Sequence, residues 1–401
     1  MNYWPIKIEN YSWLGNKYPV GVRLLPPGGR HVLFVAQYMD LANMIVERIK
    51  REGPISFHDY MEMALYHPVL GYYTSTRTKI GKQGDYVTSP HLGPVMGMVL
   101  GKQLQEMWQQ SGSKDFTIVE YGAGEGYLCY DILNFLGSAC KHLDGLRYCI
   151  IEKSAGMRER QQRHLGGKVE WFDAIEAIGG FTGCVISNEL VDNFAVHRVV
   201  MQDVLQEVFL DFTEGFVEIL RPADESLTNY FAELGIQLPR DFQTEVNLEA
   251  TEWMKAIGTN LEKGYVITID YGYSSEELYR ACRRNGTLLC YHQHQINDDP
   301  YQAIGLQDIT THVNFSALSH WGSKSGLTSA ELINQATFLL GLDFKDCLRK
   351  TLAAGQDKLK AIWQEALLTR TLLLDMGMRF KVLIQHKGMT GKRIAGLTYA
   401  K

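Results

Sequence analysis

Residues 117–133, "TIVEYGAGEGYLCYDIL", combine an acid and three glycines in a spacing that could bind a charged, nucleotide-like ligand. Glu120 ends a short apolar run, and Gly122, Gly124 and Gly126 follow at every second position before a helix-like pattern. A glycine-rich turn lets a ligand approach the backbone, and the N-terminus of the next helix supplies oriented N–H donors. The segment therefore predicts a ligand site between a strand and a helix.

The glycine spacing distinguishes between two kinds of ligand. A dinucleotide-binding turn has the spacing GxGxxG, whereas this chain has GxGxG with an acid two residues before the first glycine. Glu120 would repel a pyrophosphate and attract a cation. S-adenosylmethionine, which carries an ammonium and a sulfonium, fits that requirement.

Two further acids follow apolar runs in the same region. Glu152, after "YCII", lies where a carboxylate could accept both ribose hydroxyls, and Asp173, after "VEWF", could reach the adenine amino group. Each acid taken alone could equally be an ordinary solvated residue at a strand end. Together with Glu120 they favour the S-adenosylmethionine interpretation.

The elements that position these acids alternate between strand and helix. Short apolar runs that end in polar or acidic residues alternate with helical segments, which is typical of a parallel sheet wound with helices. Ligands bind beyond the carboxyl ends of such strands. The acids at those ends are therefore expected along one edge: Glu120, Glu152, Asp173, Glu189 and Asp270.

The remaining chain predicts additions to this core. Residues 39–115 predict two helices, the second with Ser56 as its N-cap, and then a glycine-punctuated loop that could form a cofactor lid. The aromatic residues of the second helix are expected mainly to pack on the domain. Residues 194–263 predict an inserted lobe with an antiparallel ribbon that turns near Gly215, and residues 116–193 and 264–401 predict the core with C-terminal additions. Residues 1–38 predict a poorly ordered extension.

Composition excludes several classes of protein. The chain has 401 residues, 45% of them hydrophobic, which is enough for a large core, and a formal charge of -5 that argues against a broad nucleic-acid surface. No apolar run reaches the length of a membrane span. The seven cysteines form no CxxC pair, and His292 and His294 lack a wider ligand cluster, so we expect no metal site and a reducing compartment.

The chain resembles the MidA-like family of class I methyltransferases, which includes a mitochondrial factor that methylates an arginine of a respiratory complex I subunit. The matching stretches lie between residues 40 and 386 and include "GPISFHDYMEMALYHPVLGYY", "GKQGDYVTSP", "VEYGAGEGYL", "ISNELVDNFAVHR" and "ITIDYGY". The resemblance implies a seven-stranded Rossmann-like sheet with an antiparallel last strand. It also implies a second lobe built from the N-terminal helices, the insertion after the fourth strand and the C-terminal helices.

The same resemblance implies site residues. It places S-adenosylmethionine at the glycine loop and Glu152, with a contribution from the "GDYVTSP" segment through Gly84, Asp85, Thr88 and Ser89. One position departs from the family pattern, because Ala195 stands where the family commonly has proline in "NELLDAxP". The loop that carries the substrate groups is therefore expected to differ in shape.

Candidate substrate groups follow the fourth strand. An arginine acceptor needs carboxylates near the transferred methyl group, because a guanidinium is always charged and binds carboxylates through a bidentate fork. Asn188, Glu189 and Asp192 are placed there by topology, with Glu189 as the leading candidate. Asp308 and His312 would form an i, i+4 pair if their segment is helical, and could accept a proton, orient the substrate or simply join the second lobe to the core.

Three functional classes follow from these observations. The first is a protein arginine methyltransferase whose substrate docks on the second lobe, and the family resemblance implies a complex I subunit as that substrate. The second is a factor that binds S-adenosylmethionine and has little catalytic role, and the third is a nicotinamide-dependent oxidoreductase, which the glycine spacing disfavours. The expected location is the cytoplasm in a bacterium or the mitochondrial matrix in a eukaryote.

Overall fold

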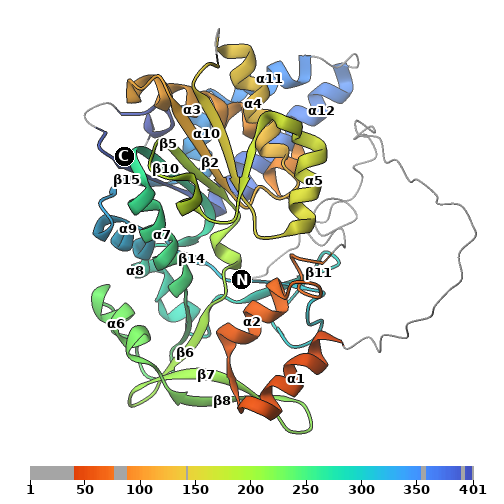
Figure 1. Ribbon diagram of the computed structural model, residues 1–401, viewed down its shortest axis with the longest axis vertical. Helices are drawn as coiled ribbons and strands as arrows, with labels where there is room; N and C mark the ends of the chain where they lie inside the picture. Colours follow the sequence, from red (N-terminus) through yellow and green to blue (C-terminus); the bar gives the residue numbers. More distant parts are fainter. Residues whose placement is uncertain (1–39, 76–87, 141–142, 354–357, 390–392, 400–401) are drawn as a thin grey trace, which may run out of the picture.

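The central element of the protein is a mixed sheet that runs through the upper half of the molecule (Figure 1). The computed structural model describes residues 40–75, 88–140, 143–353, 358–389 and 393–399. The main path of the sheet has the order β15-β16-β10-β5-β2-β3-β4. Its strands are β15 (Thr328–Asn334), β16 (Phe380–Lys387), β10 (Leu261–Tyr273), β5 (Phe181–Asn188), β2 (Phe116–Tyr121), β3 (Leu146–Ile151) and β4 (Glu170–Phe172).

Strand direction in this sheet confirms the expected topology. Strands β10, β5, β2, β3 and β4 are parallel, whereas β16, the last strand in sequence, pairs antiparallel with β10. The short strand β14 (Val313–Asn314) extends the sheet beside the end of β10. The apolar runs read from the sequence as strands are thus β2, β3, β4, β5 and β10, and their carboxyl ends meet at one edge.

Helices cover both faces of this sheet because its parallel strands are apolar on both sides. One apolar cluster joins the sheet to α3 (Val95–Ser111), α4 (Tyr127–Ala139), α5 (Ala155–Leu165), α10 (Gln335–Gly341) and α11 (Phe344–Ala353). A second cluster joins the opposite face to α7 (Leu248–Asn260) and α9 (Phe315–Lys324). Helix α7, predicted as part of the inserted lobe, therefore packs on the core.

The C-terminal helices also lie elsewhere than predicted. The segment comprises α12 (Lys358–Thr369), the π-helical η6 (Arg370–Asp375) and α13 (Met376–Arg379). Leu372 of η6 lies in the same buried cluster as Leu100 of α3 and Val382 of β16, so this end of the chain packs on the core and not on the second lobe. The sequence shows amphipathic helices here, but periodicity does not identify the surface that each helix covers.

The second lobe lies below the sheet in Figure 1. It contains α1 (Leu41–Glu52), α2 (Phe57–Tyr66) and a five-stranded sheet of β1 (Ile55–Ser56), β7 (Leu205–Phe212), β8 (Phe216–Pro222), β6 (His197–Met201) and β9 (Gln243–Val246). Ser56 caps α2 by accepting from the backbone N–H of Asp59 at 3.0 Å, as predicted. The ribbon β7–β8 turns at Gly215, where the Thr213 N–H donates to the Gly215 carbonyl. Both predictions are confirmed.

Smaller elements complete the molecule. A three-stranded sheet contains β12 (Gln295–Asn297), β11 (Leu289–His292) and β13 (Asp308–Thr310), and two short helices are α6 (Glu225–Glu233) and α8 (Ser275–Leu278). The 3-10 turns include η1 (Ser89–Leu92) and η4 (Val191–Asn193). Others are η2 (Gly166–Lys168), η3 (Ile175–Ile178), η5 (Ala281–Arg283) and η7 (Ala395–Leu397).

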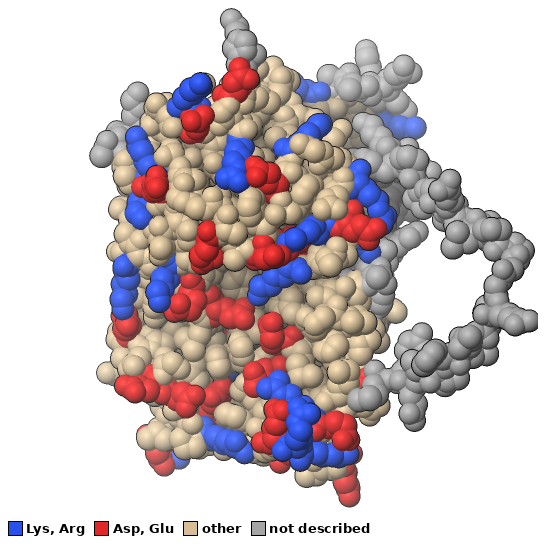
Figure 2. Space-filling view, in the orientation of Figure 1, with Lys and Arg blue, Asp and Glu red and all other residues tan. Residues whose placement is uncertain are grey.

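Charged side chains of both signs lie interspersed on the face of the molecule that Figure 2 shows. Among the described residues, no helix combines the length and apolar character needed to cross a bilayer. The proposed extension, residues 1–38, lies outside the described residues.

Candidate active site

The glycine loop connects β2 to α4 in the conformation that the sequence predicts. Gly122, Gly124 and Gly126 have φ values of 62°, 54° and 85°, a left-handed region that side chains disfavour. A Cβ on Gly122 would also lie 2.7 Å from Cδ1 of Leu190. Gly126 is buried and is the N-cap of α4, so the loop leads directly into the N-terminus of that helix.

A cavity opens beside this loop at the carboxyl ends of β2, β3 and β5. It contains about 880 Å³ of space between atoms, part of it open to solvent. Seven predicted site residues line it: Thr88, Glu120, Gly122, Gly124, Glu152, Asn188 and Glu189. A cavity therefore lies at the sheet edge where the sequence predicts the ligand site. Residues that precede the sheet, among them Tyr66 and Tyr73, also line it.

Glu152 is held in a fixed orientation at the end of β3. Its Oε1 accepts the N–H of Ser154 at 2.9 Å, and its Oε2 accepts Nε2 of Gln161 at 3.0 Å. Gln161 is itself fixed, because it donates to the Gly124 carbonyl and accepts from Nε1 of Trp171. A carboxylate held in this way suits the two hydroxyls of a ribose.

Glu120 lies beneath the glycine loop and is almost fully buried. The Tyr148 hydroxyl donates to its Oε2 at 2.7 Å. Burial raises the pKa of Glu120 to about 7, Glu152 adds to the rise, and the hydrogen bond from Tyr148 opposes it. Folding raises this pKa, so the protonated Glu120 carboxyl contributes to the stability of the fold. That contribution is fully present below pH 4.5, the ordinary pKa, and is lost as the pH rises through 7.

Glu189 and Asn188 face the cavity from the end of β5. Glu189 has a φ of 54°, unusual for a residue with a side chain, and its Oε1 accepts Nδ2 of Asn188 at 3.1 Å and the N–H of Ser89 at 3.4 Å. Burial raises the pKa of Glu189 to about 8, and the nearby Asp192 adds to the rise. A cation bound beside this buried carboxyl would lower its pKa and favour its ionised form.

Asp192 lies behind the cavity wall and does not line the cavity. Its carboxyl is buried next to Asp270 and accepts a hydrogen bond from Tyr271, and burial raises its pKa to about 6. Asp270 was noted from the sequence only as one acid of the edge. Asp192 belongs to the turn that follows β5, whereas Asp270 lies on β10, and neither acid lines the cavity.

The segment that holds Asp308 and His312 is not helical, so the condition for their i, i+4 pairing is not met. Asp308 begins β13, and β14 begins at Val313, so the two residues do not share a helix face. The segment "DITTHV" contains β-branched residues, and its first three residues pair with β11 and its last with β10, which outweighs the i, i+4 spacing. Asp308 nevertheless acts near the site, because it accepts the hydroxyl of Tyr73 at 2.8 Å and Tyr73 lines the cavity.

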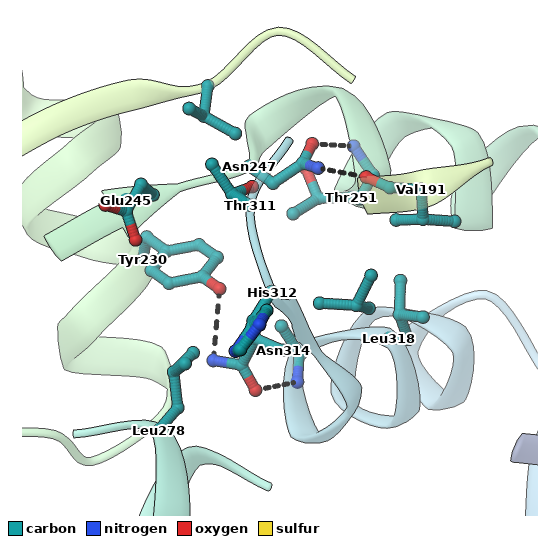
Figure 3. A pocket seen from close by; sticks show the side chains of 14 residues that line it. Val191, Tyr230, Glu245, Asn247, Thr251, Leu278, Thr311, His312, Asn314 and Leu318 are labelled. Carbon is teal, nitrogen blue, oxygen red and sulfur yellow. Dashed lines mark hydrogen bonds between the residues drawn. The ribbon is translucent and has the colours of Figure 1, made fainter. Parts of the chain in front are cut away.

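His312 lines a second, smaller cavity, which Val191 and Asn314 also line (Figure 3). This cavity contains about 400 Å³ of space between atoms, compared with about 880 Å³ in the first cavity. Burial lowers the pKa of His312 to about 4, with a further effect from Arg283, so the imidazole is neutral at physiological pH. His312 therefore does not meet the cofactor cavity.

Other predicted cofactor residues divide into three groups. Asp173 is exposed, pairs with Arg158 at 2.7 Å and does not line the cavity. Ser89 contributes its backbone N–H to Glu189, as described above. Gly84 and Asp85 lie outside the described residues, so their predicted role stays a prediction.

Several residues that line the cavity were missed by sequence reasoning. Tyr66 and Tyr73 stack with ring centroids 5.5 Å apart, and the Tyr66 hydroxyl donates to Oδ1 of Asn193 at 2.7 Å. His91 and Lys153 also line the cavity. The aromatic content of "ALYHPVLGYY" was the available signal, but it favoured packing because aromatic residues usually serve the core.

Comparison with known proteins agrees with this geometry. Residues 99–333 match the family described as S-adenosyl-L-methionine-dependent methyltransferase (Methyltransf_28). A crystal structure of a protein from Burkholderia thailandensis bound to S-adenosyl-homocysteine is 30% identical, with a TM-score of 0.81, and the match covers 94% of this chain and 98% of that one.

Curated relatives are more distant in sequence but similar in extent. The protein arginine methyltransferase NDUFAF7 homolog, mitochondrial, of Drosophila melanogaster is 24% identical, covering 87% of this chain and 85% of its own. Protein arginine methyltransferase NDUFAF7, mitochondrial, of Homo sapiens is 25% identical, covering 87% and 84%.

The fold and the cavity together define a class I methyltransferase that uses S-adenosylmethionine. The strand order with one antiparallel strand, the left-handed glycine loop and the buried carboxylates of Glu120 and Glu152 all fit that cofactor. The chain belongs to the MidA-like family of S-adenosyl-L-methionine-dependent methyltransferases.

The raised pKa of Glu120 predicts that S-adenosylmethionine binding depends on pH. We expect the ligand's ammonium to favour the ionised carboxylate, so affinity should rise about tenfold per pH unit up to about pH 7 and then level off. Calorimetry at several pH values, in buffers of different ionisation enthalpy, should detect proton release on binding. In Glu120→Gln the affinity should no longer depend on pH in this range. If the pH dependence persists in this variant, another group is responsible for it.

Proposed function

We propose that the protein transfers a methyl group from S-adenosylmethionine to an arginine side chain of a protein substrate. The observation that carries this proposal is the position of Glu189, which lines the cofactor cavity from a left-handed turn beside the glycine loop. An arginine acceptor requires such a carboxylate near the transferred methyl group. The related NDUFAF7 proteins are named as protein arginine methyltransferases.

The residues around the acceptor position have complementary tasks. S-adenosylmethionine would supply the methyl group from its sulfonium and leave as the neutral thioether S-adenosylhomocysteine. Glu189 orients the guanidinium and offsets its charge, and its raised pKa suits it to hold the proton that the methylated nitrogen must release. Asn188 fixes the Glu189 carboxyl, and the stacked Tyr66 and Tyr73 wall off one side and limit access of water.

The acceptor protein is proposed to dock on the second lobe. Tyr66 belongs to α2 of that lobe and Asp308 of β13 holds Tyr73, so the lobe and the acceptor side of the cavity are joined directly. A subunit of respiratory complex I is the acceptor that the family resemblance implies, in the mitochondrial matrix for a eukaryotic source or the cytoplasm for a bacterial one.

Mass spectrometry of methylarginine sites tests this function. Proteomes of cells with and without the protein should differ at one or a few arginine sites, and these sites should stay unmethylated when only the Glu189→Gln variant is supplied. If no arginine site changes while lysine or other methyl sites do, the acceptor assignment fails. If no methyl site of any kind changes, the protein would be a factor that binds the cofactor and has little catalytic role.

A further inference from the structure

We propose that Asp270 is a positioning residue for methyl transfer, which holds the turn from Glu189 to Asp192 so that the Glu189 carboxyl faces the cavity. This inference rests on the proposed role of Glu189 as the group that binds the acceptor. Asp270 itself is fully buried and does not line the cavity. It would therefore act through the turn and not through contact with a reactant.

One oxygen of Asp270 binds three successive backbone N–H groups. Its Oδ2 accepts from Leu190 at 3.2 Å, Val191 at 2.9 Å and Asp192 at 3.3 Å. Its Oδ1 accepts the N–H of Tyr271 at 2.9 Å. Both oxygens are thus engaged as acceptors of backbone donors.

The geometry of the sheet explains why this turn needs an internal acceptor. The last backbone hydrogen bond from the turn to β10 runs from the Glu189 N–H to the Ile269 carbonyl, at 2.9 Å, and the chain then leaves the strand path with Glu189 in the left-handed region. That conformation costs about 1–2 kcal/mol for a residue with a side chain. The next three N–H groups have no strand partner, and a buried N–H left without an acceptor costs about 1–3 kcal/mol.

The carbonyl side of the turn is held from other elements. The Val191 carbonyl accepts Nδ2 of Asn247, the N-cap of α7, at 3.1 Å (Figure 3). The Asp192 carbonyl accepts the Thr311 N–H at 2.8 Å, and the Asn193 carbonyl, 3.0 Å from the Tyr66 hydroxyl, shares its proton with Oδ1 of the same residue. The N–H groups of the turn are hydrogen-bonded to Asp270 and its carbonyls to three other segments, so the backbone is held in one arrangement. This arrangement fixes the position from which the Glu189 side chain extends.

The surroundings make Asp270 difficult to replace. Burial and the neighbouring carboxyls of Asp192 and Glu189 raise its pKa, and the four N–H donors oppose that rise. An asparagine would match its size but offer only one acceptor oxygen, so its amide N–H₂ would face either Tyr271 N–H or the turn. Asp270→Asn should therefore loosen the turn while leaving the apolar packing of the sheet unchanged.

A double-mutant cycle tests the inference. Methyl transfer from labelled S-adenosylmethionine into the proteins of a lysate from cells that lack the protein should fall about 100-fold in Asp270→Asn, the scale expected when a reacting group is displaced by about 1 Å. The affinity for S-adenosylhomocysteine should change less than about threefold. In a Glu189→Gln background, Asp270→Asn should cost less than about threefold more, because both changes remove the same interaction.

Thr268→Val is the matched control. Thr268 lies two residues earlier on the same face of β10, is equally buried, and its hydroxyl has no hydrogen-bond partner among the described residues. It should keep wild-type activity. Additive losses for Asp270→Asn and Glu189→Gln, or activity of Asp270→Asn within about threefold of wild type, would overturn the proposal.

Two further measurements keep the outcome clear. Hydrogen exchange of the peptide that covers residues 189–193 should speed up in Asp270→Asn and stay unchanged in Thr268→Val, independently of any activity. If Asp270→Asn does not fold, Asn247→Asp is the second variant. The aspartate still accepts the N–H of Ala250 but can no longer donate to the Val191 carbonyl. This variant should lower activity about tenfold, and its effect should again be non-additive with that of Glu189→Gln. Full activity of Glu189→Gln would instead refute the proposed function, and faster exchange in Asp270→Asn would still show that Asp270 holds the turn.

Discussion

Replacing Glu189 with glutamine should reduce methyl transfer about 100- to 1,000-fold, the usual cost of removing one group that stabilises charge in a transition state. The glutamine oxygen can still accept from Asn188 and Ser89, so the turn should keep its shape. Its amide N–H₂ would then face the cavity and repel a guanidinium. Transfer of labelled methyl groups at saturating S-adenosylmethionine measures the loss, and calorimetry with S-adenosylhomocysteine should show unchanged affinity.

A matched control and a pH profile make this prediction specific. Glu62 of α2 is a half-buried carboxyl outside the cavity lining, and Glu62→Gln should keep activity within about twofold. With a pKa of about 8 for Glu189 in the free enzyme, kcat/KM for the acceptor should rise about tenfold per pH unit below about pH 8 and then level off. A flat wild-type profile, or an unchanged slope in Glu189→Gln, would contradict the assignment.

Replacing Glu152 with glutamine should weaken S-adenosylhomocysteine binding about 100-fold, or about 3 kcal/mol. Hydrogen bonds to a charged group contribute about 1.5–3 kcal/mol each, and this carboxylate is placed to accept two from a ribose. Gln161 cannot turn to accommodate the new amide, because Gly124 and Trp171 hold both ends of its side chain. Calorimetry measures the loss directly and needs no methyl acceptor.

Asp173→Asn is the control for this second substitution. Asp173 also follows a strand of the sheet, but it is exposed and pairs with Arg158 outside the cavity lining. Its replacement should change the affinity less than about threefold. A large loss for Asp173→Asn would restore its predicted contact with adenine, and a small loss for Glu152→Gln would remove the ribose assignment.

The cofactor half of the site was predictable because its parts are close in the sequence. Gly122, Gly124 and Gly126 follow directly from one strand, and their left-handed conformations are required by the turn itself. Glu152 ends the adjacent strand β3, and parallel strands bring their carboxyl ends to the same edge. Periodicity and strand ends were sufficient here.

The acceptor half was less predictable because it is assembled from distant segments. Tyr66 and Tyr73 come from before the sheet, and Tyr73 is held by Asp308, 235 residues later in the chain. The i, i+4 spacing of Asp308 and His312 was misleading, since pairing of β13 with β11 overrode it. The spacing of two residues describes a contact only if the element between them is known.

The sequence by itself determined the class of sheet, the glycine loop and the cofactor, because local backbone requirements and strand periodicity are properties of short segments. Tertiary structure decided which acids reach the cavity. It left Asp173 in solvent, buried His312 beside a separate, smaller cavity, and gave Asp270 the N–H groups of a turn that begins at Glu189. Burial and hydrogen-bond partners come from segments far apart in the chain, and they decide which acids meet a ligand and which hold the backbone.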